Sequence, residues 1–220
     1  FEQVLHLARS QTPGPLAGWI TMDKPEPLAD LELTRGIPER INTHGEILQP
    51  LDESRARELV DELVRNGADS ITISLLHAYA NPIHELKLRD IIANIYPDLP
   101  ISLSSEILPE FREYERTLVT VMNAYIRPGM QRYLDNFRQK LENERLNSPL
   151  NIVRSDSGLM GVERAMDSPV YTLLSGPAGG VAGAAHLSGL AGYPNALGFD
   201  MGGTSTDVSL IQDGEPTSSR

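Results

Sequence analysis

Apolar residues switch between helical and strand spacing from residue 52 to residue 104, and this rhythm constrains the fold most strongly. The expected elements are a helix over 52–67, a strand over 70–76, a helix over 82–95 and a strand over 101–104. Asp52 and Asn81 are typical helix caps, while Gly67 and Pro97 are typical of helix ends. Helices and strands that alternate in this way form layers, so the sequence predicts an α/β fold.

The remaining segments complete the expected secondary structure. Residues 11–30 are rich in Pro and Gly and predict an irregular connection, and short strands fit residues 31–48. Residues 111–145 predict two helices, or one that is broken at Arg127-Pro128-Gly129, because a proline ring removes a donor and clashes with the preceding turn. Further expected elements are strands at 150–153 and 170–174 with a helix at 162–166 between them, and a helix at 178–190.

The 178–190 stretch is dominated by Ala and Gly. Each helical glycine costs about 1 kcal/mol relative to alanine, so Gly179, Gly180 and Gly183 need a compensating packing or ligand contact. Small side chains favour a helix that packs closely on a sheet or on another helix. A direct contact with a ligand is the alternative interpretation.

The most informative segment for function covers residues 196–211, where two strand-forming runs flank a turn of glycine and hydroxyl residues. Gly202 and Gly203 let main-chain amides approach a phosphate, and successive amides in such a turn form a concave anion site. Hydroxyl groups follow at Thr204, Ser205 and Thr206, and an aspartate stands at each end of the turn, Asp200 and Asp207.

Two carboxylates beside a polyphosphate would repel it unless a metal ion lies between them. Mg²⁺ prefers oxygen ligands and keeps several waters, so Asp200 is the expected metal ligand, direct or through water, with Asp200 and Asp207 as the catalytic pair. An ordinary hairpin with two solvated aspartates is the alternative. The segment is not a Walker loop, which needs Gly-Lys-Ser/Thr at the start of a helix, nor a Rossmann fingerprint.

Composition limits the class of function. The formal net charge of -11 disfavours binding to nucleic acids and to anionic membranes, and no apolar run is long enough to span a bilayer. The absence of cysteine excludes disulfides and thiolate chemistry in this segment and fits the cytoplasm. Because the chain begins without Met and ends shortly after the hairpin, we expect an internal segment of a longer protein.

Four blocks of the sequence resemble the hydantoinase/oxoprolinase family, in the subunit similar to N-methylhydantoinase A. They are Leu76 to Glu85 (LHAYANPIHE), Ser104 to Thr117 (SSEILPEFREYERT), Ser175 to Val181 (SGPAGGV) and Phe199 to Asp207 (FDMGGTSTD). The last block also resembles the second phosphate loop of the actin, sugar-kinase and heat-shock-chaperone ATPases.

The resemblance implies an ATPase with a ribonuclease H-like core, preceded by a smaller α/β region. It implies the end of an N-terminal region at 1–106 and the start of the ATPase domain at 107–220. The implied activity is ATP-dependent hydrolysis of a cyclic amide, with Mg²⁺, a small-molecule substrate and a hydantoinase B-type partner subunit or domain. A subunit of an acetone or acetophenone carboxylase and a non-catalytic nucleotide switch are the alternatives.

The family pattern also includes an earlier phosphate loop and a later adenosine-binding segment, and neither is present in these residues. We therefore expect the isolated segment to lack ATPase activity. At Asp156-Ser157-Gly158 the family usually has an Asx-Gly-Gly turn, so Ser157 is a departure that puts in doubt any role needing full backbone freedom.

Two further groups of polar residues are candidate sites. His77, Asn81, His84 and Glu85 form a polar cluster at a strand-to-helix junction, where metal ligation is conceivable and local capping is the simpler explanation. The charged run Glu110, Arg112, Glu113, Glu115 and Arg116 could line a cleft, although such runs are usually solvated helix faces.

Overall fold

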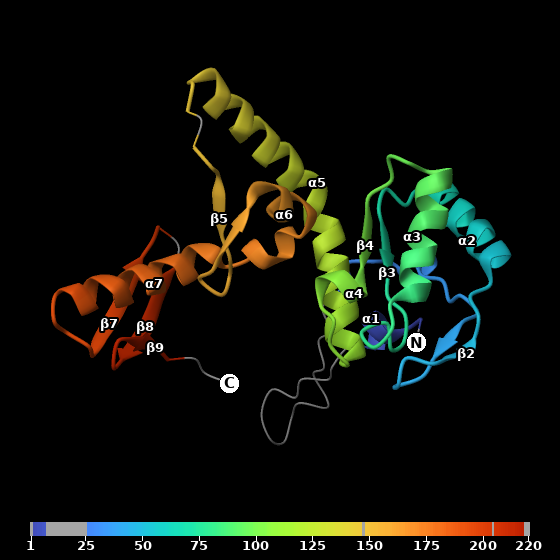
Figure 1. Ribbon diagram of the computed structural model, residues 1–220, viewed down its shortest axis with the longest axis horizontal. Helices are drawn as coiled ribbons and strands as arrows, with labels where there is room; N and C mark the ends of the chain where they lie inside the picture. The colour runs from blue at the N-terminus through green and yellow to red at the C-terminus, as the bar shows by residue number, and fades with distance from the viewer. Residues whose placement is uncertain (1, 8–25, 147, 204, 218–220) are drawn as a thin grey trace. The chain divides into compact units, whose positions relative to one another are not determined.

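The computed structural model describes residues 2–7, 26–146, 148–203 and 205–217, and the chain forms two compact units (Figure 1). The first unit covers Phe1–Pro128 and the second covers Gly129–Arg220. Most of the expected irregular connection at 11–30 lies outside the described residues, since residues 8–25 are among those not described. Over the described residues, no helix combines the length and the apolar character that a membrane crossing needs.

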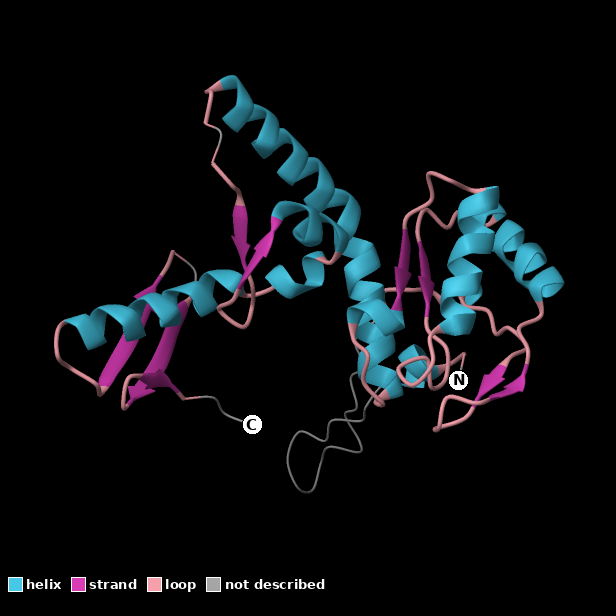
Figure 2. Cartoon of the chain, in the orientation of Figure 1, coloured by secondary structure: helices cyan, strands magenta, loops and turns pink. Residues whose placement is uncertain are grey.

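The first unit mixes helices and strands, as Figure 2 shows. Its elements are α1 (Val4–Leu7), η1 (Leu31–Leu33), β1 (Arg40–Ile41), β2 (Ile47–Gln49), α2 (Glu53–Arg65), β3 (Ile71–Ile73), α3 (Ile83–Ile95), β4 (Ile101–Leu103), α4 (Ser104–Ile107) and the first half of α5 (Glu113–Asn143). β1 and β2 pair antiparallel, and β3 and β4 pair parallel. The expected α/β class is confirmed in this coarse sense.

The caps that the sequence predicted explain where α2 and α3 begin. The Asp52 carboxylate accepts a hydrogen bond from the Arg55 amide (2.9 Å), and Asn81 Oδ1 accepts one from the Ile83 amide (3.1 Å). After α2, Gly67 has a φ of 97°, a conformation that costs glycine little. The strands expected at 70–76 and 101–104 are shorter than predicted.

The parallel pair β3–β4 has one apolar face, which packs against α2 and α3. Ile71 lies opposite Ile101 and Ile73 opposite Leu103, so these four side chains share that face. The buried core also contains Leu51, Ala56, Val60, Leu88, Ile91 and Ile92. This single layer of helix on sheet holds most of the apolar core of the first unit.

The other face of the pair is polar and meets the first half of α5. Ser102 lies on this face, and its Oγ accepts a hydrogen bond from Asn123 Nδ2 (3.2 Å). Just beyond β3, the Oγ of Ser74 and the Oγ1 of Thr117 share a hydrogen bond of 2.7 Å. Arg127 Nη1 donates to the Ile101 carbonyl (2.7 Å), so hydrogen bonds fix this part of α5 on the sheet.

A buried arginine joins the strand ends to α5. Arg116 is fully buried, and its guanidinium donates to the carbonyls of Leu75 (2.7 Å) and Glu110 (2.8 Å). Burial lowers its pKa, and the nearby carboxylate of Glu85 opposes that shift. Glu85, also fully buried, accepts hydrogen bonds from the Leu75 amide, Ser104 Oγ and the Ser105 amide. A solvated face is therefore the wrong interpretation of this charged run at Arg116.

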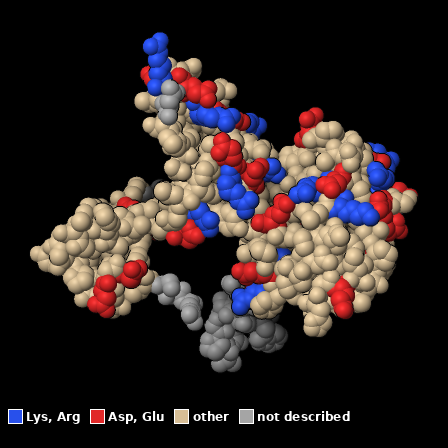
Figure 3. Space-filling model, viewed as in Figure 1, with Lys and Arg blue, Asp and Glu red and all other residues tan. Residues whose placement is uncertain are grey.

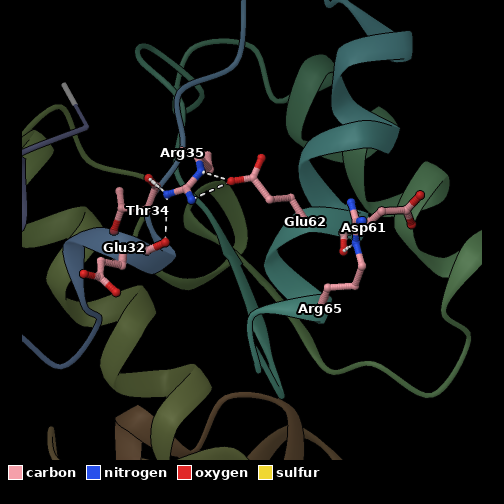
Figure 4. A network of polar contacts seen from close by, with 6 residues as sticks. All are labelled: Glu32, Thr34, Arg35, Asp61, Glu62 and Arg65. Carbon is pink, nitrogen blue, oxygen red and sulfur yellow. Dashed lines mark hydrogen bonds and ion pairs between the residues drawn. The ribbon is translucent and has the colours of Figure 1, made fainter.

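A partly buried ion pair connects the segment after η1 to α2 (Figure 4). Arg35 Nε and Nη2 donate to the same oxygen of Glu62, at 2.9 and 2.6 Å. Arg35 Nη1 donates to the carbonyls of Glu32 and Thr34. The hydrogen bond from Arg35 lowers the pKa of the Glu62 carboxyl.

The second unit contains the second half of α5, β5 (Asn151–Val153), β6 (Leu159–Gly161), α6 (Val162–Asp167), η2 (Pro169–Thr172), α7 (Ser175–Leu190), β7 (Ala196–Met201), β8 (Thr206–Gln212) and β9 (Glu215–Pro216). β5 pairs antiparallel with β6, and β7, β8 and β9 form an antiparallel sheet in that order. A small core gathers around α5 and α6, from Leu134, Met160, Val162 and Ala165.

Two sequence-based expectations in this region are wrong. α5 continues through Pro128 as one helix, although a proline inside a helix costs about 3 kcal/mol. Side chains on both sides of it, Ala124 and Leu134, are buried, and this packing offsets the lost hydrogen bond. The strand expected at 170–174 is instead the 3₁₀ turn η2, which begins at Pro169, where the fixed φ of proline suits a helical turn.

We predict that Arg116→Met destabilises the protein by about 3–5 kcal/mol, because it leaves the carbonyls of Leu75 and Glu110 without their donor and removes the positive charge near the buried Glu85 carboxylate. Guanidinium unfolding followed by circular dichroism measures the change. The matched control Arg112→Met removes an exposed arginine one turn earlier and should change stability by no more than about 0.5 kcal/mol. Equal effects of the two substitutions would contradict the buried network.

Candidate functional site

The hairpin β7–β8 brings the two predicted aspartates together. In its register Asp200 lies directly opposite Asp207, as Phe199 lies opposite Val208. Residues directly opposite each other in an antiparallel pair point to the same face of the sheet, with Cβ atoms about 4.5–5.5 Å apart. Like charges in this arrangement destabilise the hairpin unless something neutralises them.

The helix α7 lies along the sheet β7–β8–β9 (Figure 2). The proximity of Gly180 to Asp200 shows that α7 covers the face that carries both aspartates. A Cβ built on Gly180 would lie 3.4 Å from Asp200 Oδ2, and one built on Gly198 would lie 3.5 Å from the Cβ of Ala184. Gly180 and Ala184 are one helical turn apart, so a row of small residues rests on β7. A methyl group at either glycine would make an ordinary van der Waals contact between α7 and β7, so these glycines mark where the helix and the strand lie close.

The turn between the strands exposes its main chain. The Gly202 amide donates to the Ser205 carbonyl (2.9 Å), and this hydrogen bond closes the turn. Gly202, Gly203, Ser205 and Thr206 are all exposed, and no atom lies within 4 Å of where a Cβ on Gly203 would stand. Thr204, the remaining predicted phosphate-binding residue, lies outside the described residues. The described part of the turn therefore leaves room for a phosphate beside its amides.

The part of the sequence that contains the two aspartates has acidic residues but no Lys or Arg. No Lys or Arg occurs from residue 165 to residue 219, whereas Asp200, Asp207, Asp213 and Glu215 all lie on or beside the sheet. Figure 3 agrees, since the visible face of this sheet shows acidic side chains and no basic ones. A divalent cation fits this donor set, because Mg²⁺ takes carboxylate oxygens and water.

The alternative metal site around His77, His84 and Glu85 is wrong. His84 Nδ1 lies 2.7 Å from the Glu39 carboxylate, with both side chains almost fully buried, and Glu85 binds main-chain amides and Ser104. His77 contacts Tyr79 instead, edge to face. Over the described parts of the chain, no three His, Cys, Asp or Glu side chains are grouped so as to hold a metal ion.

Two contacts of the site were missed by the sequence-based interpretation. The cost of helical glycine signalled a packing constraint in α7, but nothing showed that Gly180 is the glycine beside Asp200. The second contact is at Ser157, whose φ is 65° and whose Oγ donates to the Ala178 carbonyl in α7 (2.9 Å). A left-handed conformation costs a non-glycine residue about 1–2 kcal/mol, so Ser157 carries backbone strain at this position.

Comparisons with known proteins identify the family to which this chain is similar. A family model described as hydantoinase/oxoprolinase N-terminal region matches residues 1–96, and one described as hydantoinase/oxoprolinase matches residues 116–220. The resemblance inferred from the four sequence blocks is thereby confirmed.

Curated relatives and solved structures agree with these models. The chain is 32% identical to the acetophenone carboxylase gamma subunit of Aromatoleum aromaticum, over 86% of this chain and 26% of that protein. It is 36% identical to the 5-oxoprolinase of Saccharomyces cerevisiae, over 76% of this chain and 13% of that protein.

A nucleotide-free structure of acetone carboxylase superposes with a TM-score of 0.86 at 30% identity, covering 99% of this chain and 31% of that chain. The ATP-dependent caprolactamase of Pseudomonas jessenii superposes with a TM-score of 0.71 at 31% identity, covering 80% of this chain and 26% of that chain. The chain spans less than a third of the length of these four proteins.

We predict that Asp207→Asn raises the melting temperature of the full-length protein in EDTA, because it removes one of two facing negative charges. Mg²⁺ at about ten times its Kd should stabilise the unmodified protein by about 1.4 kcal/mol and the variant by much less. Asp213→Asn, at the β8–β9 turn, is the matched control and should keep the full response to Mg²⁺. A response to Mg²⁺ that survives in Asp207→Asn would contradict the site.

Proposed function

Because the chain belongs to the hydantoinase/oxoprolinase family, we propose that the full-length protein uses ATP and Mg²⁺ to hydrolyse a cyclic amide. The observation that carries this proposal is the facing pair Asp200 and Asp207 beside an exposed glycine turn, in a segment without basic residues. Such a pair is unfavourable alone and becomes favourable with a divalent cation. The turn beside it offers main-chain amides to a phosphate.

Different residues of the β7–β8 hairpin would bind the metal ion and the phosphate groups. Asp200 would hold the metal ion, directly or through water, and Asp207 on the opposite strand would complete the acidic pair. The Gly203 amide and the hydroxyl groups of Thr204, Ser205 and Thr206 would bind phosphate oxygens. Gly202 would shape the turn, since its amide donates to the Ser205 carbonyl. Gly180 would keep α7 close behind Asp200, so that the carboxylate keeps its orientation.

ATP would transfer its γ-phosphoryl group to the amide oxygen and leave as ADP, which would make the amide carbon reactive towards water. Water would then add to that carbon, the ring C–N bond would break and inorganic phosphate would leave. Phosphoryl transfer needs mainly positioning and neutralisation of charge from the protein. The hairpin residues fit that task, since they offer amides, hydroxyls and carboxylates. One phosphate loop is present in this chain, so we expect the isolated segment to be inactive.

The architecture of the whole protein is part of the proposal. We infer that α7 and the sheet β7–β8–β9 belong to a ribonuclease H-like lobe, which the antiparallel order of that sheet supports. We also propose that an N-terminal region ends at residue 106 and that an ATPase region begins at residue 107. The cytoplasm is the proposed location, since the chain has no cysteine.

A partner subunit or domain of the hydantoinase B type belongs to the same proposal, because several relatives are named as subunits. The second candidate function is that of a ketone carboxylase subunit. It is favoured by the superposition on acetone carboxylase, which covers nearly the whole chain. Both functions use ATP at the same hairpin and differ in the carbonyl compound that is activated.

We predict that ADP release by the full-length protein, with its partner subunit, rises on addition of a lactam such as 5-oxoproline or caprolactam. Stimulation by acetone or acetophenone with bicarbonate would instead establish the carboxylase. Asp200→Asn should lower turnover at least about 100-fold, because it removes a charge that acts through the bound metal, whereas Asp213→Asn should retain it. ATP binding without turnover on any of these compounds would contradict both enzymes and indicate a nucleotide switch.

A further inference from the structure

The β5–β6 hairpin contacts α7 at two consecutive residues, Ala178 and Gly179, and the next residue, Gly180, lies beside Asp200 of β7. The Ala178 carbonyl accepts the hydrogen bond from Ser157 Oγ (2.9 Å). A Cβ built on Gly179 would lie 3.6 Å from Val153 Cγ1 of β5, and one on Gly180 would lie 3.4 Å from Asp200 Oδ2 of β7. The short stretch 178–180 is thus held by one hairpin and lies against the acidic residue of the other.

The beginning of the helix lacks a side-chain cap. Its N-cap, Leu174, is exposed, has a φ of 61° and makes no side-chain capping bond. None of the α7 side chains in the described structure is buried. Tertiary packing usually supplies most of the stability of a helix, so α7 depends more than most helices on individual contacts of this kind.

The turn that carries Ser157 is itself well ordered by its neighbours. Asp156 accepts hydrogen bonds from the Gly158 amide (3.0 Å) and from Arg154 Nη2 (2.7 Å), and these partners lower its pKa. The Ser155 amide donates to the Tyr171 carbonyl (2.7 Å). These hydrogen bonds hold the backbone that carries the Ser157 hydroxyl.

The φ of 65° at Ser157 is a conformation that glycine adopts more easily. A serine at this position keeps a backbone strain that a glycine would not have. In return it provides a hydroxyl group, which glycine lacks, and that hydroxyl binds α7.

We propose that Ser157 is a positioning residue, which fixes the first turn of α7 through Ala178 and so holds Gly180 against Asp200. Ser157 does not contact Asp200 itself and acts only through the helix. The part of this inference that concerns Mg²⁺ rests on the proposed function, whereas the hold on α7 does not.

The test compares Ser157→Ala and Ser157→Gly in the full-length protein. Both remove the hydroxyl, but only glycine relieves the strained φ, so Ser157→Gly should melt at a higher temperature than Ser157→Ala. If Ser157 positions the site, the Mg²⁺ concentration for half-maximal ATP turnover rises in both variants by about three- to tenfold, the value of one hydrogen bond. Turnover at saturating Mg²⁺ should change little.

The matched control is Ser155→Ala. It removes a hydroxyl from the same turn, whose hydrogen bond of 2.7 Å goes to the Tyr171 carbonyl and not to α7. This variant should leave the Mg²⁺ dependence unchanged. If the Mg²⁺ concentration for half-maximal turnover is unchanged in both Ser157 variants, the positioning role is wrong. It is also wrong if that concentration differs between the variants in proportion to their melting temperatures.

Amide hydrogen exchange of residues 178–190 gives a readout that does not need turnover. Exchange should accelerate about three- to tenfold in both Ser157 variants and stay unchanged in Ser155→Ala. If the unmodified protein shows no Mg²⁺-dependent turnover, the proposed function fails while this exchange result still decides the hold on α7. Exchange that is the same in all four proteins would refute it.

Discussion

The close approach of α7 to β7 is the constraint on which the site depends. Glycine at positions 180 and 198 and alanine at position 184 let the helix rest directly on the strand that carries Asp200. The strand register then places Asp207 opposite Asp200 on the same face. An arrangement of this kind concentrates negative charge, which a divalent cation would neutralise in the function that we propose.

The first unit uses its sheet in a different way. One face of β3–β4 is apolar and packs on α2 and α3, whereas the other is polar and binds α5 through Ser102 and Asn123. Arg116 of α5 donates a hydrogen bond to the Leu75 carbonyl, just after β3 and near the buried Glu85. A buried charge of this kind rarely adds stability over an apolar substitute, but its hydrogen bonds fix which residues meet.

The sequence predicted those parts of the fold and of the candidate site whose residue patterns lie within a few positions of each other. The caps at Asp52 and Asn81 and the alternating spacing of apolar residues identified α2 and α3, because those signals act within a few residues. The acidic hairpin was recognisable for the same reason, since its glycines and aspartates are adjacent in the sequence. Pro128 misled the prediction for α5, because burial of Ala124 and Leu134 on either side outweighed a local rule. The contacts of Gly180, Arg116 and Ser157 join residues far apart in the sequence, and a single sequence gives no sign of such partners.

The central claim is that Asp200 holds a metal ion beside a nucleotide phosphate, and its most direct test is an anomalous difference map. Crystals of the full-length protein with its partner would be grown with ADP and Mn²⁺ in place of Mg²⁺. The account predicts a peak within about 2–5 Å of the Asp200 carboxylate, directly or through one water, with the phosphates next to the turn at 202–206. A Mn²⁺ and nucleotide bound elsewhere in the protein, with Asp200 and Asp207 surrounded only by solvent, would contradict it.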